Sequence, residues 1–145
     1  MIGRLIGARR RARRLDKELG HGLWRRVHDR YVRGLDRYHQ VIEGIADDAV
    51  HHRLVLLGDR LAAELETVRA LCHEAHAAHP GEGMQIPGEA AELHAGLSRA
   101  ANHLATTAEA AAMVRLGAAE VEAVSRRAQR VFEMLRAAEA VRVGR

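Results

Sequence analysis

The segment LCHEAHAAHP holds the residues whose types and spacing best fit metal chemistry. Cys72, His76 and His79 are spaced i, i+4 and i+7, so they share one face of a helix. Thiolate and imidazole are preferred ligands of zinc and related ions, and this spacing lets neighbouring side chains reach one ion. The pattern predicts a metal site, to which Glu92 or His94 could add a fourth ligand.

The same residues also fit a purely structural role. Cys72 and His76 continue an apolar stripe that runs through Leu65 and Val68, so this face is expected to pack against other helices. The run HEAH is one residue shorter than the H-E-x-x-H pattern of zinc proteases. We therefore expect a buried thiol and partly exposed histidines. The metal site and a nucleophilic Cys72 with a histidine partner stay open as alternatives.

Other motifs for catalysis are missing from the sequence. It contains no glycine-rich phosphate loop, no G-x-S-x-G nucleophile elbow and no paired-carboxylate pattern. We therefore expect a non-catalytic protein with no cofactor apart from the candidate metal.

The elements that must position these residues are helices. Alanine, leucine, arginine and glutamate dominate the chain, aromatic residues make up 3% of it, and there are two prolines. Apolar residues recur in steps of three and four, which predicts amphipathic helices and an all-α fold. The stripes are Trp24, Val27, Tyr31, Leu35, Tyr38, Ile42, Ile45; Val50, Leu54, Leu57, Leu61, Leu65, Val68, Cys72, Ala75; and Leu93, Leu97, Ala100, Leu104, Thr107, Ala111, Val114, Ala118, Val121, Val124, Ala128, Val131, Leu135, Ala138.

Three breaks divide the predicted helices. The strongest is HPGEGMQIPG at 79–88, where two prolines and three glycines cannot continue a helix. A weaker break lies at Gly44, a candidate C-terminal cap, followed by Asp47 or Asp48 as the N-cap of the next helix. The weakest is Gly117, which has no turn residues around it.

These breaks leave two main architectures open. In the first, residues 23–79 and 88–143 form two long helices in an antiparallel hairpin. In the second, both bend near Gly44 and Gly117 and fold into a four-helix bundle. A three-helix version bent only at Gly44 also remains. Because a two-helix hairpin buries too narrow a stripe for stability, the first architecture needs a second copy of the chain to complete its core. We favour the four-helix core, supplied by one chain or two.

Charge is distributed unevenly along the chain. Residues 1–37 contain twelve basic and four acidic side chains, whereas the remaining 108 contain eleven basic and fifteen acidic ones. We therefore divide the chain into a basic N-terminal arm, residues 1–22, and a helical bundle domain, residues 23–145. Only one basic residue is lysine, a bias typical of a GC-rich bacterial genome, but such a bias does not explain why the arginines cluster.

The arm is a candidate for binding an anionic partner. The alternative is that it only extends the first helix of the bundle, with arginines that are solvated or pair with the acidic body. Arginines surround a narrow apolar stripe that runs through Leu5, Ala8, Ala12, Leu15, Leu19 and Leu23. Arginine also interrupts the face of Ile2 and Ile6, so membrane insertion would be shallow. Electrostatics would dominate binding to an anionic membrane or protein surface. Nucleic acid is the alternative partner. The candidate residues are Arg4, Arg9, Arg10, Arg11, Arg13 and Arg14.

The remaining signals concern location and role. The sequence has a single cysteine, no apolar run of about 20 residues and no leader-like segment, which predicts a cytoplasmic protein. A peripheral location at the membrane stays open as an alternative. An amphipathic segment followed by a long helical hairpin resembles, in plan alone, the phage-shock membrane-remodelling proteins. We expect an adaptor or assembly component that forms a homo-oligomer or binds a helical protein.

Overall fold

The computed structural model describes residues 2–80, 86 and 88–142, and within them the fold is all-α. No strand occurs in these residues. The elements are α1 (Ile2–Leu19), α2 (Leu23–Ile42), α3 (Asp48–Ala78), the short 3₁₀ helix η1 (Gly88–Ala90), α4 (Ala91–Arg115) and α5 (Val121–Ala140).

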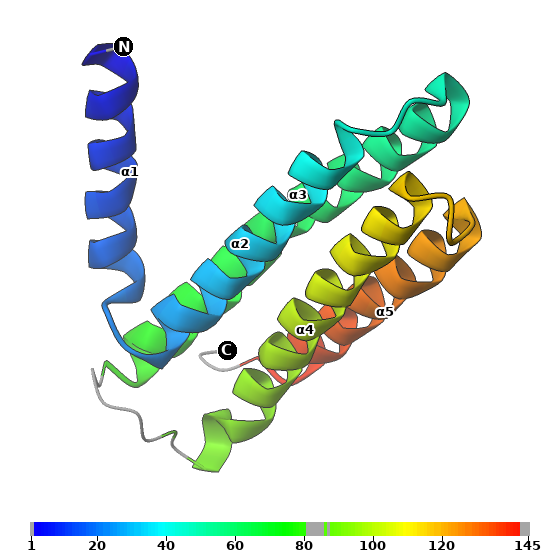
Figure 1. Ribbon diagram of the computed structural model, residues 1–145. Coiled ribbons are helices and arrows are strands. Elements are labelled where there is room, and N and C mark those ends of the chain that lie inside the picture. Colours follow the sequence, from blue (N-terminus) through cyan, green and yellow to red (C-terminus); the bar gives the residue numbers. More distant parts are fainter. Residues whose placement is uncertain (1, 81–85, 87, 143–145) are drawn as a thin grey trace.

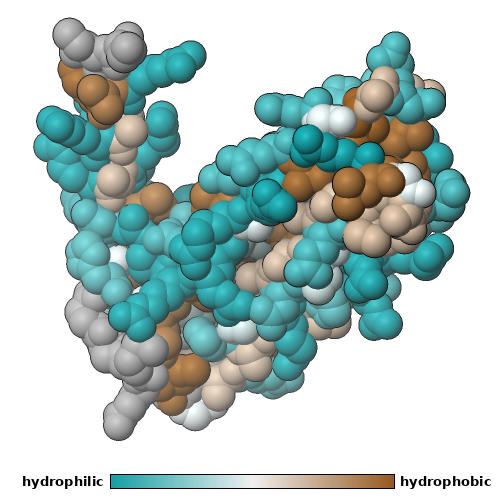
Figure 2. Space-filling view, in the orientation of Figure 1, coloured by the Kyte–Doolittle hydropathy of each residue, from teal (hydrophilic) through white to brown (hydrophobic). Residues whose placement is uncertain are grey.

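Helices α2 to α5 pack lengthwise against one another, and α1 stands apart from them (Figure 1). Helix α3 runs back along α2, and α5 runs back along α4. The two pairs meet through α2 against α4 and α3 against α5. Helix α1 contacts α2 and α3 only near the end that leads into α2, and hydrophilic residues surround most of its length (Figures 1 and 2). We call α2–α5 the body and keep the name arm for residues 1–22.

The core of the body confirms the three predicted stripes. Nearly all of their residues are buried in one cluster to which α2, α3, α4 and α5 all contribute. The exceptions are Ile45, Val50, Leu65 and Val114, which are half-buried, and Ala118, which is exposed.

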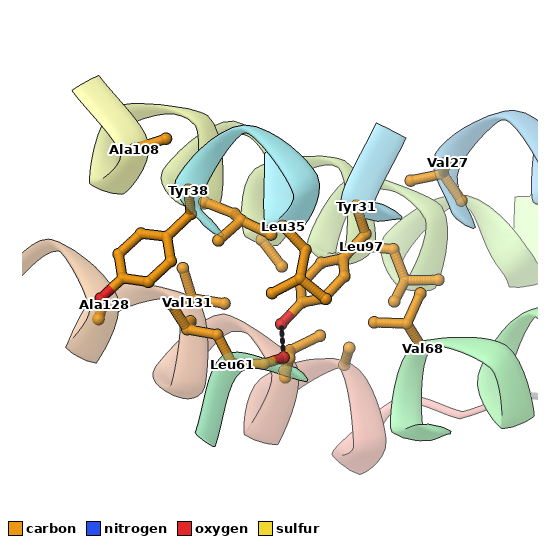
Figure 3. Packing of buried hydrophobic residues seen from close by; sticks show 14 of the residues in the cluster. Val27, Tyr31, Leu35, Tyr38, Leu61, Val68, Leu97, Ala108, Ala128 and Val131 are labelled. Atoms are coloured by element: carbon orange, nitrogen blue, oxygen red, sulfur yellow. Dashed lines mark hydrogen bonds between the residues drawn. The ribbon is translucent and has the colours of Figure 1, made fainter. Parts of the chain in front are cut away.

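Two buried tyrosines join α2 to α3. The hydroxyl of Tyr31 donates a hydrogen bond of 2.7 Å to the carbonyl of Leu61 (Figure 3). The hydroxyl of Tyr38 donates one of 2.6 Å to the carbonyl of Leu54. Because each hydroxyl has a partner, burying these large rings leaves no polar atom of theirs unsatisfied.

The weaker predicted breaks, at Gly44 and Gly117, are real helix ends, so neither long helix of the hairpin alternative is continuous. Asp47 caps α3, accepting a 2.9 Å hydrogen bond from the amide of Val50. Gly117 has φ of 77°, and the amides of Gly117 and Ala118 bond back to the carbonyls of Val114 and Met113. This is the Schellman pattern, which ends a helix through backbone bonds alone.

The arm is a separate helix and not the extension of α2 that the sequence suggested. Gly20 has φ of 69°, and its amide bonds to the carbonyl of Asp16 at 3.0 Å. A left-handed glycine of this kind ends a helix and turns the chain. The strongest predicted break, 79–88, falls between α3 and η1, although residues 81–85 and 87 lie outside the described part of the chain.

Candidate functional site

All six candidate arginines of the arm project into solvent. Arg4, Arg9, Arg10, Arg11, Arg13 and Arg14 are exposed, and none of them forms an ion pair with any described residue. Every residue from Ala8 to Arg14 is exposed, so the body covers none of this segment. The structure therefore presents the predicted cluster as a free cationic helix.

The acidic residues of the arm, by contrast, hold it to the body. Oδ1 of Asp16 accepts a 2.7 Å hydrogen bond from Arg25 of α2. Oε2 of Glu18 accepts one of 2.7 Å from Arg69 of α3. Leu19, which follows Glu18 in the sequence, is fully buried in the core. Burial of Leu19 and the two ion pairs together fix where α1 leaves the body.

These attachments extend into a charged network on α2. Arg25 also contacts both carboxylate oxygens of Asp29 at 3.1 Å, and Asp29 lies 2.9 Å from Nδ1 of the buried His28. The sequence left open that arm arginines pair with an acidic body. The structure has the reverse arrangement, with arm carboxylates paired to arginines of the body.

The arm also exposes two large apolar side chains among its arginines. Leu5 is 61% exposed and Ile6 is 45% exposed. Leu15, further along the same helix, is half-buried and packs against the core. The apolar side chains of α1 therefore pack against the body at one end of the helix and face solvent at the other. In the described part of the chain, no helix has the length and apolarity needed to cross a membrane.

The second predicted site, Cys72, His76 and His79, does not assemble as a metal centre. Among the described residues, no group of three or more histidine, cysteine, aspartate or glutamate side chains is placed to hold an ion. Cys72 is fully buried in the core, whereas His76 and His79 are half-buried. Cys72 and His76 lie on α3 with the predicted spacing, but α3 ends at Ala78, so His79 lies just beyond the helix, and the thiol points into the core.

The surroundings of Cys72 also disfavour a thiolate. Burial, and to a smaller degree the charge of Asp29, raises the pKa of the Cys72 thiol well above its ordinary value. A thiol must lose its proton to bind a metal or act as a nucleophile. Nε2 of His79 instead lies 2.8 Å from Oε1 of Glu89, an ion-pair distance without hydrogen-bond geometry. The structural interpretation of this segment is the better supported one.

His94, the other proposed ligand, packs against an aromatic ring. Its ring lies 5.5 Å from that of Trp24 in an edge-to-face arrangement with an interplanar angle of 74°. Burial lowers the pKa of His94, and the positive charge of Arg30 lowers it further. The neutral form is therefore the one that the fold favours.

This environment predicts a pH dependence of stability. Because the pKa of His94 is lower in the folded state than its ordinary 6.5, the unfolded chain binds more protons as pH falls below that value. The contribution of His94 to the free energy of unfolding is complete above about pH 6.5. It is lost as the pH falls toward the pKa that His94 has in the folded state. We expect His94→Gln to flatten the fall in unfolding free energy between about pH 7 and pH 5.

Chemical denaturation at a series of pH values measures this slope. The exposed His52 provides a matched control, and His52→Gln should keep the slope of the parent chain. Equal slopes in the parent and His94→Gln would show that burial of His94 is not coupled to its protonation.

Sequence reasoning missed a second cationic feature, which lies on the body. Arg30, Arg33 and Arg37 of α2 and Arg127 of α5 line a groove over α4. The signal was present in the i, i+3, i+7 spacing of the three α2 arginines. It was hidden because counting charge over residues 1–37 merged the arm with the first part of α2.

Comparison with known proteins does not assign the chain to a family. No protein-family model, no curated protein and no solved structure matches the chain.

Proposed function

We propose that this chain is a non-catalytic adaptor that attaches to an anionic membrane surface through the arginines of α1 and holds its helical body beside that surface. The observation that carries the proposal is the division of charge on the arm. Its carboxylates are used to fasten it to the body, and its six arginines are left exposed without an ion pair to any residue that the structure describes.

The shape of the arm suits a surface contact. Residues 2–14 extend about 20 Å as a helix, long enough to lie along lipid head groups while the body stays clear of them. Each basic residue near an anionic leaflet contributes about 1 kcal/mol of binding. Leu5 and Ile6 can enter the head-group region, but the neighbouring arginines limit them to shallow insertion.

Binding would also relieve repulsion within the helix. Six arginines within fourteen residues place like charges at neighbouring helical positions, which destabilises an isolated helix. Lipid phosphates and carboxylates would neutralise these charges. We therefore expect the exposed part of α1 to be a more stable helix on an anionic surface than in solution.

The body is proposed to be a four-helix bundle that is complete within one chain. Support comes from the single core cluster, to which α2, α3, α4 and α5 each contribute buried residues. A core closed in this way does not need a second copy for stability. The role of the body would be to present its outer faces to protein partners.

Nucleic acid remains the second candidate partner, because the same arginines could contact phosphates of DNA or RNA. The arm itself contains no aromatic residue for stacking on bases, and Trp24, Tyr31 and Tyr38 are buried in the body. Binding to an anionic membrane surface requires only cationic and apolar side chains, and the arm exposes both.

Parallel binding measurements separate the two candidates. The full chain is mixed with phosphatidylcholine vesicles, with vesicles that also contain phosphatidylserine, and with duplex DNA, each across a salt series. We expect binding to the phosphatidylserine vesicles, weak binding to neutral ones, and affinity that falls with salt. Tighter binding to duplex DNA than to anionic vesicles, with a steeper salt dependence, would favour the nucleic-acid alternative.

A further inference from the structure

A groove runs over α4 on the body, well away from the arm's exposed arginines. It has a volume of about 870 Å³ and opens to solvent. Its floor is made mostly by small residues of α4, among them Ala101, Ala105 and Ala112. Figure 2 shows this face as pale, weakly hydrophobic surface along α4 between bands of hydrophilic residues. The groove exists because α4 carries alanine where its neighbours α2 and α5 carry long side chains.

The walls of the groove are cationic. Arg30, Arg33 and Arg37 line it from α2 and Arg127 lines it from α5, whereas Glu109 is the one carboxylate among its lining residues. Arg30 donates a hydrogen bond to Asn102 on the floor. The other three arginines form no ion pair with any described residue.

Some arginines elsewhere on the body are, by contrast, paired with carboxylates of a neighbouring helix. Arg53 pairs with Glu122, Arg136 with Glu64, and Arg142 with Glu74. The groove therefore concentrates positive charge beside an apolar floor, and an acidic partner would complement it.

The chemistry of the floor favours a helix as that partner. Alanine methyl groups let two helices approach closely, and no aromatic residue lines the groove to stack on nucleic-acid bases. Along α2, the rise per residue separates Arg30, Arg33 and Arg37 by about 4.5 and 6 Å. Carboxylates at i, i+3 and i+7 of a helix lying alongside have the same spacings. The arm of this chain cannot be the occupant, because it would bring arginine against arginine.

We propose that the groove between α2, α4 and α5 binds an acidic amphipathic helix of a partner protein, with small residues facing α4 and glutamates or aspartates facing Arg33, Arg37 and Arg127. The proposal extends the adaptor role by naming a partner class. It uses a different surface from the arm, so either assignment can fail without the other.

The probe is a synthetic alanine-rich helical peptide with glutamates at i, i+3 and i+7, titrated into the full chain and followed by fluorescence anisotropy. We expect saturable binding, and no binding of the same peptide with lysine in place of glutamate. The double variant Arg33→Glu/Arg37→Glu should weaken binding by at least about tenfold. Arg99→Glu/Arg130→Glu, at exposed positions outside the groove, should leave it within about twofold.

A second pair of variants tests the floor without changing charge. Ala105→Trp fills the groove and should also weaken binding by at least about tenfold, whereas Ala137→Trp, at an exposed position of α5 outside the groove, should not. Removal of residues 2–14 should leave peptide binding intact.

Several outcomes would overturn the proposal. They are no saturable binding of the glutamate peptide, equal losses in groove and control variants, or loss of binding when the arm is removed. Duplex DNA binding that depends on Arg33 and Arg37 and resists removal of the arm would assign the groove to nucleic acid instead.

Discussion

Replacing the six arm arginines with glutamine should lower the affinity for phosphatidylserine vesicles by about 100-fold. About half of the side chains around a helix can face a flat surface at once, and each contributes about 1 kcal/mol, so roughly 3 kcal/mol is lost. The fold should survive, because these side chains are exposed and form no ion pairs with described residues. Vesicle co-sedimentation measures the affinity, and thermal unfolding followed by circular dichroism checks the fold.

A charge-matched variant separates the arm from net charge. Six exposed arginines of the body that form no ion pair with described residues are replaced with glutamine in the same way, so both variants lose six positive charges from a formal net charge of +4. This control variant should keep its affinity for phosphatidylserine vesicles within a few-fold of the parent chain, because the charges that it loses are dispersed over the body. Equal losses in the two variants would mean that net charge, and not the arm, drives binding. The control positions are Arg33, Arg37, Arg99, Arg126, Arg127 and Arg130.

Leu104→Ala should destabilise the body by about 2–5 kcal/mol, the largest loss of stability that we predict for a single substitution. Leu104 is fully buried on α4 and lies directly against Gly34 of α2, where the two helices approach closely. Truncation leaves a cavity that the packed helices can fill only in part. For a chain of this length the melting temperature should fall by roughly 10 °C. Chemical and thermal unfolding measure the change.

A second substitution tests the packing of α2 against α4 more specifically. A Cβ atom added at Gly34 would lie 3.1 Å from Cγ of Leu104, so Gly34→Ala crowds that side chain. Alanine is also the better helix former by about 1 kcal/mol, and in the Leu104→Ala background this gain is no longer opposed by crowding. The change in unfolding free energy caused by Gly34→Ala should therefore be more favourable in Leu104→Ala than in the parent chain. If the effects of the two single substitutions on unfolding free energy add up to that of the double substitution within about 0.3 kcal/mol, the close approach of these helices would be contradicted.

The sequence predicted the helices and most of the core because both depend on local pattern. Apolar residues in steps of three and four identify the buried face of α2, and Tyr31 and Tyr38 occupy that face as expected. The Asp47 cap was also predictable, since its side chain satisfies a backbone amide three residues away.

The helix ends at glycines were harder to predict. At Gly117 the chain turns through a positive φ and two backbone hydrogen bonds, which need no characteristic side chains nearby. The GHG run at 20–22 carried a comparable signal for the end of α1, yet the apolar stripe that continues from Leu19 to Leu23 suggested an unbroken helix.

The sites depended on tertiary structure that no single helix encodes. Spacing correctly placed Cys72 and His76 on one face, but the depth of burial that raises the pKa of the thiol comes from neighbouring helices. Likewise, the arginines of α2 become the wall of a groove only because α4 packs beside them with alanine along its outer face.

Hydrogen exchange of the full chain, free and bound to phosphatidylserine vesicles, tests the proposed attachment most directly. An isolated helix as short as the exposed part of α1 is marginally stable in water, so its amides should exchange quickly in the free chain. We predict that vesicles slow exchange across residues 3–14 and leave α2 to α5 unchanged. Protection confined to the body, or no protection of residues 3–14 under conditions where the chain is bound, would contradict attachment through the arm.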